Sequence, residues 1–131
     1  MWDIETCNQA AENGHLDCLE YAHENGCEWG SETCVAATRN GHIDCLIYMH
    51  YEDCPRNENI CFYASQRGHL ECLVFAHQSG YKFDANLYFT MAYFGSHYGC
   101  MAYIIANAPE LEEQIRGRSN IHLYRAYKKI K

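Results

Sequence analysis

Small and apolar side chains recur along the chain at the spacing of amphipathic helices. Within residues 7–11 they fall at i, i+3 and i+4, one face of a short helix, and Asn13-Gly14 follows where a left-handed residue can end that helix. A wide apolar stripe over residues 16–22 predicts a second helix, which Asn25-Gly26 closes in the same way. The pattern therefore predicts a helix–tight turn–helix unit over residues 2–27.

The unit is repeated. Residues 13–19 read Asn-Gly-His-Leu-Asp-Cys-Leu, and close copies follow at residues 40–46 and 67–73, each 27 residues after the last, with a degraded copy at residues 95–101. A fixed period of this size is typical of repeat arrays, in which each unit is one supersecondary element stacked on its neighbours. The predicted units are 2–27, 28–54, 55–81 and 82–108.

The composition changes at residue 109. A short helix and a last basic helix, capped by Ser119 or Asn120, are expected within residues 109–131. Terminal units of a stack are atypical because one face has no neighbour and meets water. We therefore predict a capping helix pair here, and a single all-α domain over residues 1–131.

Three features of each unit resemble the ankyrin repeat family. In the first unit they are the Ala10-Ala11 pair, the run Asn13-Gly14-His15-Leu16-Asp17 and the closing Asn25-Gly26. The resemblance implies an all-α solenoid of stacked helix–turn–helix repeats. The 27-residue period is shorter than the family's usual 33 or so residues, and the missing residues fall between units. The β-hairpin fingers of ordinary ankyrin repeats are therefore expected to be reduced or absent.

The compact repeat looks like the ankyrin-like arrays of large DNA viruses of protists and of protists themselves. That resemblance implies a non-catalytic protein–protein interaction module inside the cell, in the cytoplasm, and in the host cytoplasm if the protein is viral and acts on host factors. In ankyrin-like stacks the first helix of each repeat lines the concave side, which is where the partner protein is expected to bind.

Cysteine content and hydropathy fit an intracellular chain. The longest apolar runs are far too short to span a membrane, and the opening residues lack a secretory pattern. The nine cysteines are an odd number and recur at repeat positions, which favours free thiols in a reducing compartment over a disulfide scaffold. We expect no membrane association.

The net charge of −7 is unevenly distributed. Residues 1–80 carry thirteen acids and three bases, whereas residues 81–131 carry four acids and seven bases. An acidic body argues against general nucleic-acid binding, which depends on neutralising phosphates. The basic tail, with Tyr124 and Tyr127 among its cations, leaves one alternative, a nucleic-acid-associated adaptor; a solvated capping helix is the simpler interpretation.

Histidine and cysteine at i, i+3 recur in every unit, as in His15 and Cys18. Zinc needs four converging ligands, but stacked units hold successive pairs roughly 10 Å apart, so each site has only two. We therefore predict no metal site, with the histidine bonding backbone at the turn and the thiol buried in each layer. The same spacing rules out disulfides between equivalent cysteines. Cys27 and Cys54 fall in loops, where we expect accessible thiols and leave a redox role open.

Catalysis has no support in the sequence. An active site needs an unrepeated set of acid, base or nucleophile, whereas the titratable residues here follow the repeat, and no phosphate-binding loop or nucleophile elbow is present. We predict no enzymatic activity, no cofactor and no small-molecule substrate.

Positions that vary while the repeat frame stays fixed are the best candidates for function. On the first helices these positions are expected to face outward, and aromatic residues there are favoured as binding anchors near the C-terminal half. The alternative is that some of them pack between units. The partner-binding candidates are Glu12, Arg39, Phe62, Tyr63, Gln66, Phe89, Thr90 and Tyr93.

Overall fold

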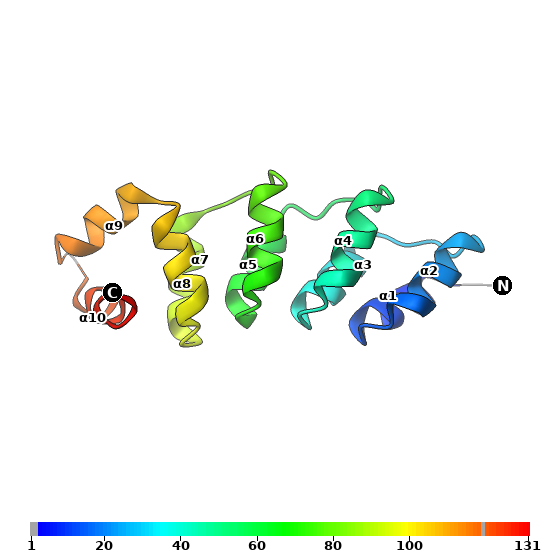
Figure 1. Ribbon diagram of the computed structural model, residues 1–131, viewed down its shortest axis with the longest axis horizontal. Coiled ribbons are helices and arrows are strands. Elements are labelled where there is room, and N and C mark those ends of the chain that lie inside the picture. The colour runs from blue at the N-terminus through cyan, green and yellow to red at the C-terminus, as the bar shows by residue number, and fades with distance from the viewer. Residues whose placement is uncertain (1–2, 119) are drawn as a thin grey trace.

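The computed structural model of the protein describes residues 3–118 and 120–131. Within them it contains ten α-helices and no strand (Figure 1). Trp2, in the predicted first unit, and Ser119, one of the two expected caps, lie outside the described residues. The helices are α1 (Ile4–Glu12), α2 (Leu16–Glu24), α3 (Ser31–Arg39), α4 (Ile43–Tyr51), α5 (Ile60–Arg67), α6 (Leu70–Gln78), α7 (Ala85–Phe94), α8 (Tyr98–Ala106), α9 (Pro109–Arg116) and α10 (Ile121–Ile130).

The first eight helices form four helix–turn–helix pairs arranged side by side in a row (Figure 1). The first helices α1, α3, α5 and α7 contact one another along the row far more closely than the second helices do, a difference that favours a concave first-helix face. The predicted all-α class is confirmed, and the connections between pairs contain no strand within the described residues.

The tight turns inside the first three pairs have a steric and a polar cause. Gly14 has φ +71°, and a Cβ placed on it would lie 2.5 Å from Nδ1 of His42 in the next unit, so both backbone and neighbour require glycine. Nε2 of that histidine donates a 3.0 Å hydrogen bond to the carbonyl of Glu12. Equivalent bonds of 3.1 Å join His69 to the Arg39 carbonyl and His97 to the Gln66 carbonyl. The expected histidine–backbone bond is confirmed for His42, His69 and His97, and its acceptor lies in the preceding unit.

The cysteine that follows each Gly-His turn does not behave the same way in every unit. Cys45, Cys72 and Cys100 are fully buried between neighbouring pairs, but Cys18 is exposed. The prediction of a buried thiol in each layer is therefore wrong for the first unit, because no described helix pair precedes it. Burial raises the pKa of the Cys45 and Cys72 thiols to about 12.

The loop cysteines are buried as well, so the expectation that Cys27 and Cys54 are accessible is wrong. Sγ of Cys27 lies 3.0 Å from Sγ of Cys7, and Sγ of Cys54 lies 3.5 Å from Sγ of Cys34. All nine cysteines are free thiols. The hydrogen bond to Cys34, together with burial, raises the pKa of Cys54, and burial raises that of Cys7 to about 12. These pairs anchor the loops that follow α2 and α4 to α1 and α3, respectively.

A second set of histidines joins neighbouring units through aromatic rings. The ring of His23 stacks 3.7 Å from Trp29, and that of His77 lies 4.0 Å from Phe83. His77 also forms a 2.6 Å hydrogen bond with the Tyr103 hydroxyl. These contacts add packing between layers beyond the repeated turn.

The C-terminal helices cover the last pair. The side chain of Asn120 accepts hydrogen bonds from the backbone N–H groups of His122 and Leu123, which starts α10 as predicted. Helix α10 packs on α7, α8 and α9 (Figure 1), and the buried side chains at this cap are Leu111, Ile115, Ala126 and Tyr127. The Tyr127 hydroxyl donates a 2.7 Å bond to Glu112, which also pairs with Lys131 at 3.2 Å.

Candidate protein-binding surface

The eight candidate residues are distributed over the four first helices, and one of them is not at the surface. Phe89, on α7, is fully buried, so its prediction as an outward-facing anchor is wrong. It belongs to the helix pair that the C-terminal helices cover, where a large apolar side chain completes the core.

Two further aromatic candidates on α5 are half-buried by their own neighbours. The Phe62 and Tyr63 rings meet edge to face with centroids 5.4 Å apart, and Phe62 also meets Tyr88 of the next unit at 6.3 Å. Phe62 thus follows the alternative interpretation, in which the aromatic side chain packs between units. Gln66 is exposed, and its carbonyl accepts the inter-unit bond from His97.

Glu12 and Arg39 lie together in a shallow hollow of about 360 Å³ where α1 and α3 meet. Glu32 and Arg67 also line it, so charges of both signs face the same space. A mixed-charge hollow of this kind can form hydrogen bonds and ion pairs with a polar partner surface, each worth little on its own because it is solvated.

Thr90 and Tyr93 lie at the other end of the row, where α7 meets the C-terminal helix α10. A hollow of about 310 Å³ that they line adjoins one of about 480 Å³, and the two share Tyr93, Phe94 and His122. We call this continuous depression the cap groove, defined by Tyr93, Phe94, Tyr98, His122, Arg125 and Lys129.

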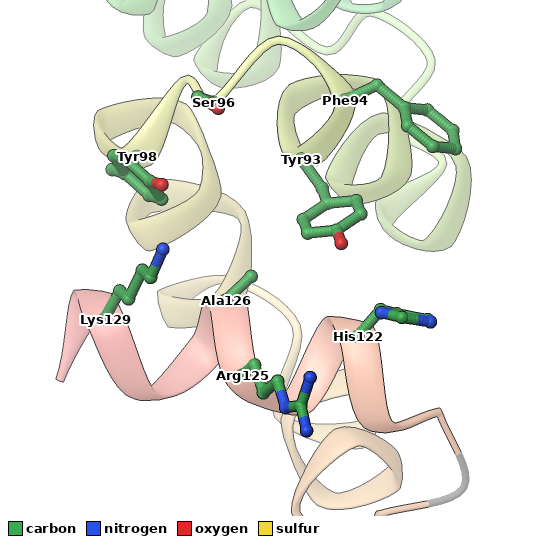
Figure 2. A pocket seen from close by; sticks show the side chains of 8 residues that line it. All are labelled: Tyr93, Phe94, Ser96, Tyr98, His122, Arg125, Ala126 and Lys129. Carbon is green, nitrogen blue, oxygen red and sulfur yellow. The ribbon is translucent and has the colours of Figure 1, made fainter.

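The two walls of the cap groove differ chemically. Figure 2 shows Tyr93 and Phe94 projecting from α7 and Tyr98 from α8, opposite His122, Arg125 and Lys129 of α10. The Phe94 ring is 73% exposed, and its centroid lies 5.6 Å from that of Tyr93. Nζ of Lys129 lies 6.0 Å from the Tyr98 ring centroid.

No acidic side chain is among the residues that line the groove, in the part of the chain that the structure describes. Arg125 and Lys129 therefore set the electrostatic potential of the cap groove, although the protein as a whole is acidic. A positive potential favours an anionic ligand. Aromatic rings on the opposite wall offer apolar contact area at low entropic cost. Together the two walls suit a segment that carries both acidic and apolar side chains.

The basic wall was not among the sequence candidates. In the sequence the aromatic first-helix positions and the basic tail supported two separate hypotheses, whereas the structure places Tyr93 across from Arg125 in one depression. The mixture of cations and aromatic residues in the C-terminal tail could have indicated a binding role. The position of this tail relative to α7 depends on how the C-terminal helices fold back, which the periodicity of the sequence does not reveal.

Two other kinds of site are absent from residues 3–118 and 120–131. No group of three histidine, cysteine, aspartate or glutamate side chains there is arranged to hold a metal ion. None of the helices there is long and apolar enough to cross a membrane.

Comparison with known proteins finds no relative of this chain. No protein-family model matches the sequence, and no curated protein sequence matches it.

Proposed function

We propose that the protein is an ankyrin-like solenoid that acts as a non-catalytic protein–protein interaction module. The partner binds along the first-helix face, from the hollow of Glu12 and Arg39 to the cap groove. The observation that carries the proposal is the cap groove itself, where exposed aromatic rings and cations converge without any role in the repeat frame. The resemblance to compact arrays of viruses and protists supports a site of action in the cytoplasm, and in the host cytoplasm if the protein is viral.

The expected partner is a protein with an acidic segment that also carries apolar or aromatic residues. Carboxylates would pair with the Arg125 guanidinium and the Lys129 ammonium, and apolar side chains would pack on Tyr93 and Phe94. Rim charges of this kind raise the association rate and select the partner, while buried aromatic contacts slow dissociation.

Selection from a displayed random-peptide library tests the proposal and does not require the partner to be identified first. We expect enrichment of peptides that combine acids with aromatic or aliphatic residues. Binding of the selected peptides should weaken by at least about tenfold in Tyr93→Ala and in the double variant Arg125→Glu/Lys129→Glu, because hot-spot substitutions cost about 2 kcal/mol or more and a tenfold loss corresponds to about 1.4 kcal/mol.

The matched control is Arg116→Glu/Lys128→Glu, which makes the same charge change on exposed cap residues outside the groove. It should bind the peptides almost as well as the unmodified protein, apart from a modest loss of long-range attraction. Equal losses in both double variants, or unchanged binding in folded Tyr93→Ala, would argue against the groove as the site.

A nucleic-acid-associated adaptor is the second candidate function. The observation that favours it is the same set of cations facing Tyr93 and Tyr98, a combination that also suits phosphates and stacked bases. Binding to a labelled single-stranded RNA or DNA, titrated with salt, separates the two candidates. Phosphate binding must weaken steeply as salt rises, with a slope set by the few cations in the groove.

A further inference from the structure

Two pairs of cysteines bring their sulfur atoms into contact inside the first two units. The first dithiol joins Cys7 on α1 to Cys27 in the loop after α2, with the sulfur atoms 3.0 Å apart. The second dithiol joins Cys34 on α3 to Cys54 in the loop after α4, with the sulfur atoms 3.5 Å apart. Both pairs span 20 residues of chain, and the function proposed above uses neither of them.

The loop sulfur occupies the same place in both units. The Cys27 sulfhydryl donates a 3.3 Å hydrogen bond to the carbonyl of Asp3, the N-cap of α1. The Cys54 sulfhydryl donates a 3.4 Å bond to the carbonyl of Gly30, the N-cap of α3. Each loop thiol is therefore held between the start of the first helix and the thiol that lies one turn further along that helix.

The repeat frame does not require cysteine at this loop position. The backbone N–H of each loop cysteine donates to the carbonyl five residues before it, at 2.9 Å for Cys27 and 3.0 Å for Cys54. In the third unit the N–H of Tyr81 makes the same bond at 3.0 Å, and Cys61 still occupies the helix position 20 residues earlier. The same backbone thus accepts tyrosine, so the two dithiols are a feature that the first two units carry in addition to the frame.

Two thiols in contact can undergo a reaction that is not open to a single buried thiol. Oxidation by two electrons joins the sulfur atoms in a bond of about 2.05 Å. Sulfur atoms that already lie 3.0 and 3.5 Å apart reach this separation by side-chain rotation and a small movement of the loop. Because each thiol is held beside its partner, its effective concentration toward that partner is high.

We propose that the first and second dithiols are modification sites that take a low-molecular-weight disulfide, of the type of glutathione disulfide, as their oxidant. One protein thiol loses its proton, and its sulfur attacks the external disulfide to form a mixed disulfide and release one thiolate. The partner thiol then loses its proton, attacks the protein sulfur of the mixed disulfide and releases the second thiolate. The protein loses two electrons and two protons, and the external disulfide is reduced to two thiols.

The loop thiol is the point of entry for the oxidant. Cys54 is 9% exposed, whereas Cys34 is 2% exposed. Burial contributes to the raised pKa of the Cys54 thiol, and the thiolate is the attacking species, so exchange proceeds during brief openings of the loop. The dithiols therefore remain reduced until the oxidant accumulates.

Oxidation would change the mechanical character of the first two units. Each disulfide closes a loop of 20 residues and so restricts the unfolded chain, which stabilises the folded units. Each also ties the loop after the second helix covalently to the first helix. The third unit, with Tyr81 at the loop position, has no counterpart of this clamp.

The test uses the full chain carrying Cys18→Ser, because Cys18 is exposed and would otherwise form mixed disulfides of its own. The protein is equilibrated without denaturant in reduced and oxidised glutathione at a series of ratios, and free thiols are then blocked with N-ethylmaleimide in acidic denaturant. Cleavage at glutamate separates the four cysteines of the two dithiols, since at least one glutamate lies between each of them and the next. Mass spectrometry of the unreduced peptides identifies the cross-links.

We expect the two predicted cross-links, each at least about tenfold more abundant than any other pairing. Cys61, whose loop counterpart is Tyr81, should be recovered as a blocked thiol and serves as the internal control. Cys27→Ser should abolish the first cross-link and retain the second, and Cys54→Ser should do the reverse. The urea midpoint should rise on oxidation and return to its original value after reduction with dithiothreitol.

Oxidation of unfolded chains would give a different set of products. Loop closure in an unfolded chain favours partners that are close in sequence, such as Cys27 with Cys34 and Cys54 with Cys61, each pair seven residues apart. Predominance of these pairings would overturn the proposal. So would glutathione addition without cross-linking, or recovery of every thiol across the whole series of ratios. None of these measurements involves the cap groove, so failure here leaves the proposed function untouched.

Discussion

The two ends of the row differ in whether further helices cover the outermost helix pair. At the C-terminal end, α9 and α10 bury Leu111 and Ile115 and turn a charged surface to solvent. At the N-terminal end, Cys18 and Tyr21 lie open on a helix pair built like those in the interior. The same repeated residues therefore have different environments according to whether a neighbour exists.

The comparison shows that the repeat motif by itself does not determine burial. Gly-His-Leu-Asp-Cys specifies a turn, a helix start and a position for a thiol, while the neighbouring pair decides whether that thiol is buried. Substitutions at one end and at the equivalent positions elsewhere in the row should therefore differ in their effects.

The largest expected effect is loss of stability at alkaline pH. Burial raises the pKa of Cys45, Cys61 and Cys72 from 9.0 to about 12, so above pH 9 the folded state binds more protons than the unfolded state. The stability these thiols contribute is complete below the unfolded pKa and is lost as the pH rises through the folded values. The urea midpoint should fall steadily between about pH 9 and pH 11.

Two cysteine variants, one at a buried and one at an exposed repeat position, test whether burial of the thiols causes the loss of stability at alkaline pH. Cys45→Ala should lower stability at pH 7 but flatten its dependence on alkaline pH, because one buried thiol no longer has to remain protonated. Cys18→Ala should leave the pH dependence as it is. The same slope in all three proteins would mean that burial of the thiols does not set the alkaline limit.

The next effect concerns packing at the cap. Ile115 is 3% exposed, so Ile115→Ala should reduce the free energy of unfolding by about 2–5 kcal/mol. Cys18→Ala at the open end should change it by about 0.5 kcal/mol or less, as for other exposed substitutions. Denaturant unfolding of both variants measures the difference, and a larger loss at Cys18 would reverse the assignment of capped and open ends.

A smaller effect is expected from the histidine bond. His97→Ala removes the 3.1 Å bond to the Gln66 carbonyl and should cost about 0.5–1.5 kcal/mol. His15→Ala, at the same repeat position, should be nearly neutral because the His15 side chain is exposed and makes no such bond with a described residue. Thermal unfolding of the pair provides the measurement; a similar cost at both positions would show that the histidine acts within its own unit.

The smallest effect is confined to the cap at acidic pH. Hydrogen bonds from Tyr127 and Lys131 lower the pKa of Glu112, so its contribution is present above the unfolded pKa and lost as the pH falls through the folded value. Limited proteolysis should therefore cut near α9 and α10 more readily as the pH falls below 4.5, the ordinary pKa of a glutamate, while α1 and α2 change less. Glu112→Gln should be cut at α9 and α10 to a similar extent across this range.

Much of the fold followed from the sequence because the determining interactions are local and repeated. The spacing of small apolar residues and the Asn-Gly stops located α1 to α8 to within a few residues, and Asn120 was one of two expected caps. These features depend on helix periodicity and turn chemistry, which a single unit already contains.

The candidate site was predicted less well because it depends on contacts between distant segments. Phe89 occupies an outward row in the repeat frame, yet it is buried in the pair that α10 covers, and Cys27 meets Cys7 from the far end of the first unit. The cap groove combines α7 with α10, and nothing in the 27-residue period specifies where α10 lies. Non-local packing decided all three outcomes, and for Phe89 and the cap groove it involves the irregular C-terminal end.

The histidine bond also limits how the length of such a chain can change. Each ring reaches back about one unit, as from His69 to the Arg39 carbonyl, and closes over the glycine of the preceding turn. Gain or loss of a whole 27-residue unit preserves every such reach, and the bond from His97 to Gln66, which spans 31 residues where the other two span 30, shows that a single extra residue is accommodated. Chains of this type should therefore lengthen and shorten by entire units while retaining one C-terminal cap, so that internal duplication in the gene supplies new binding surface without a new fold.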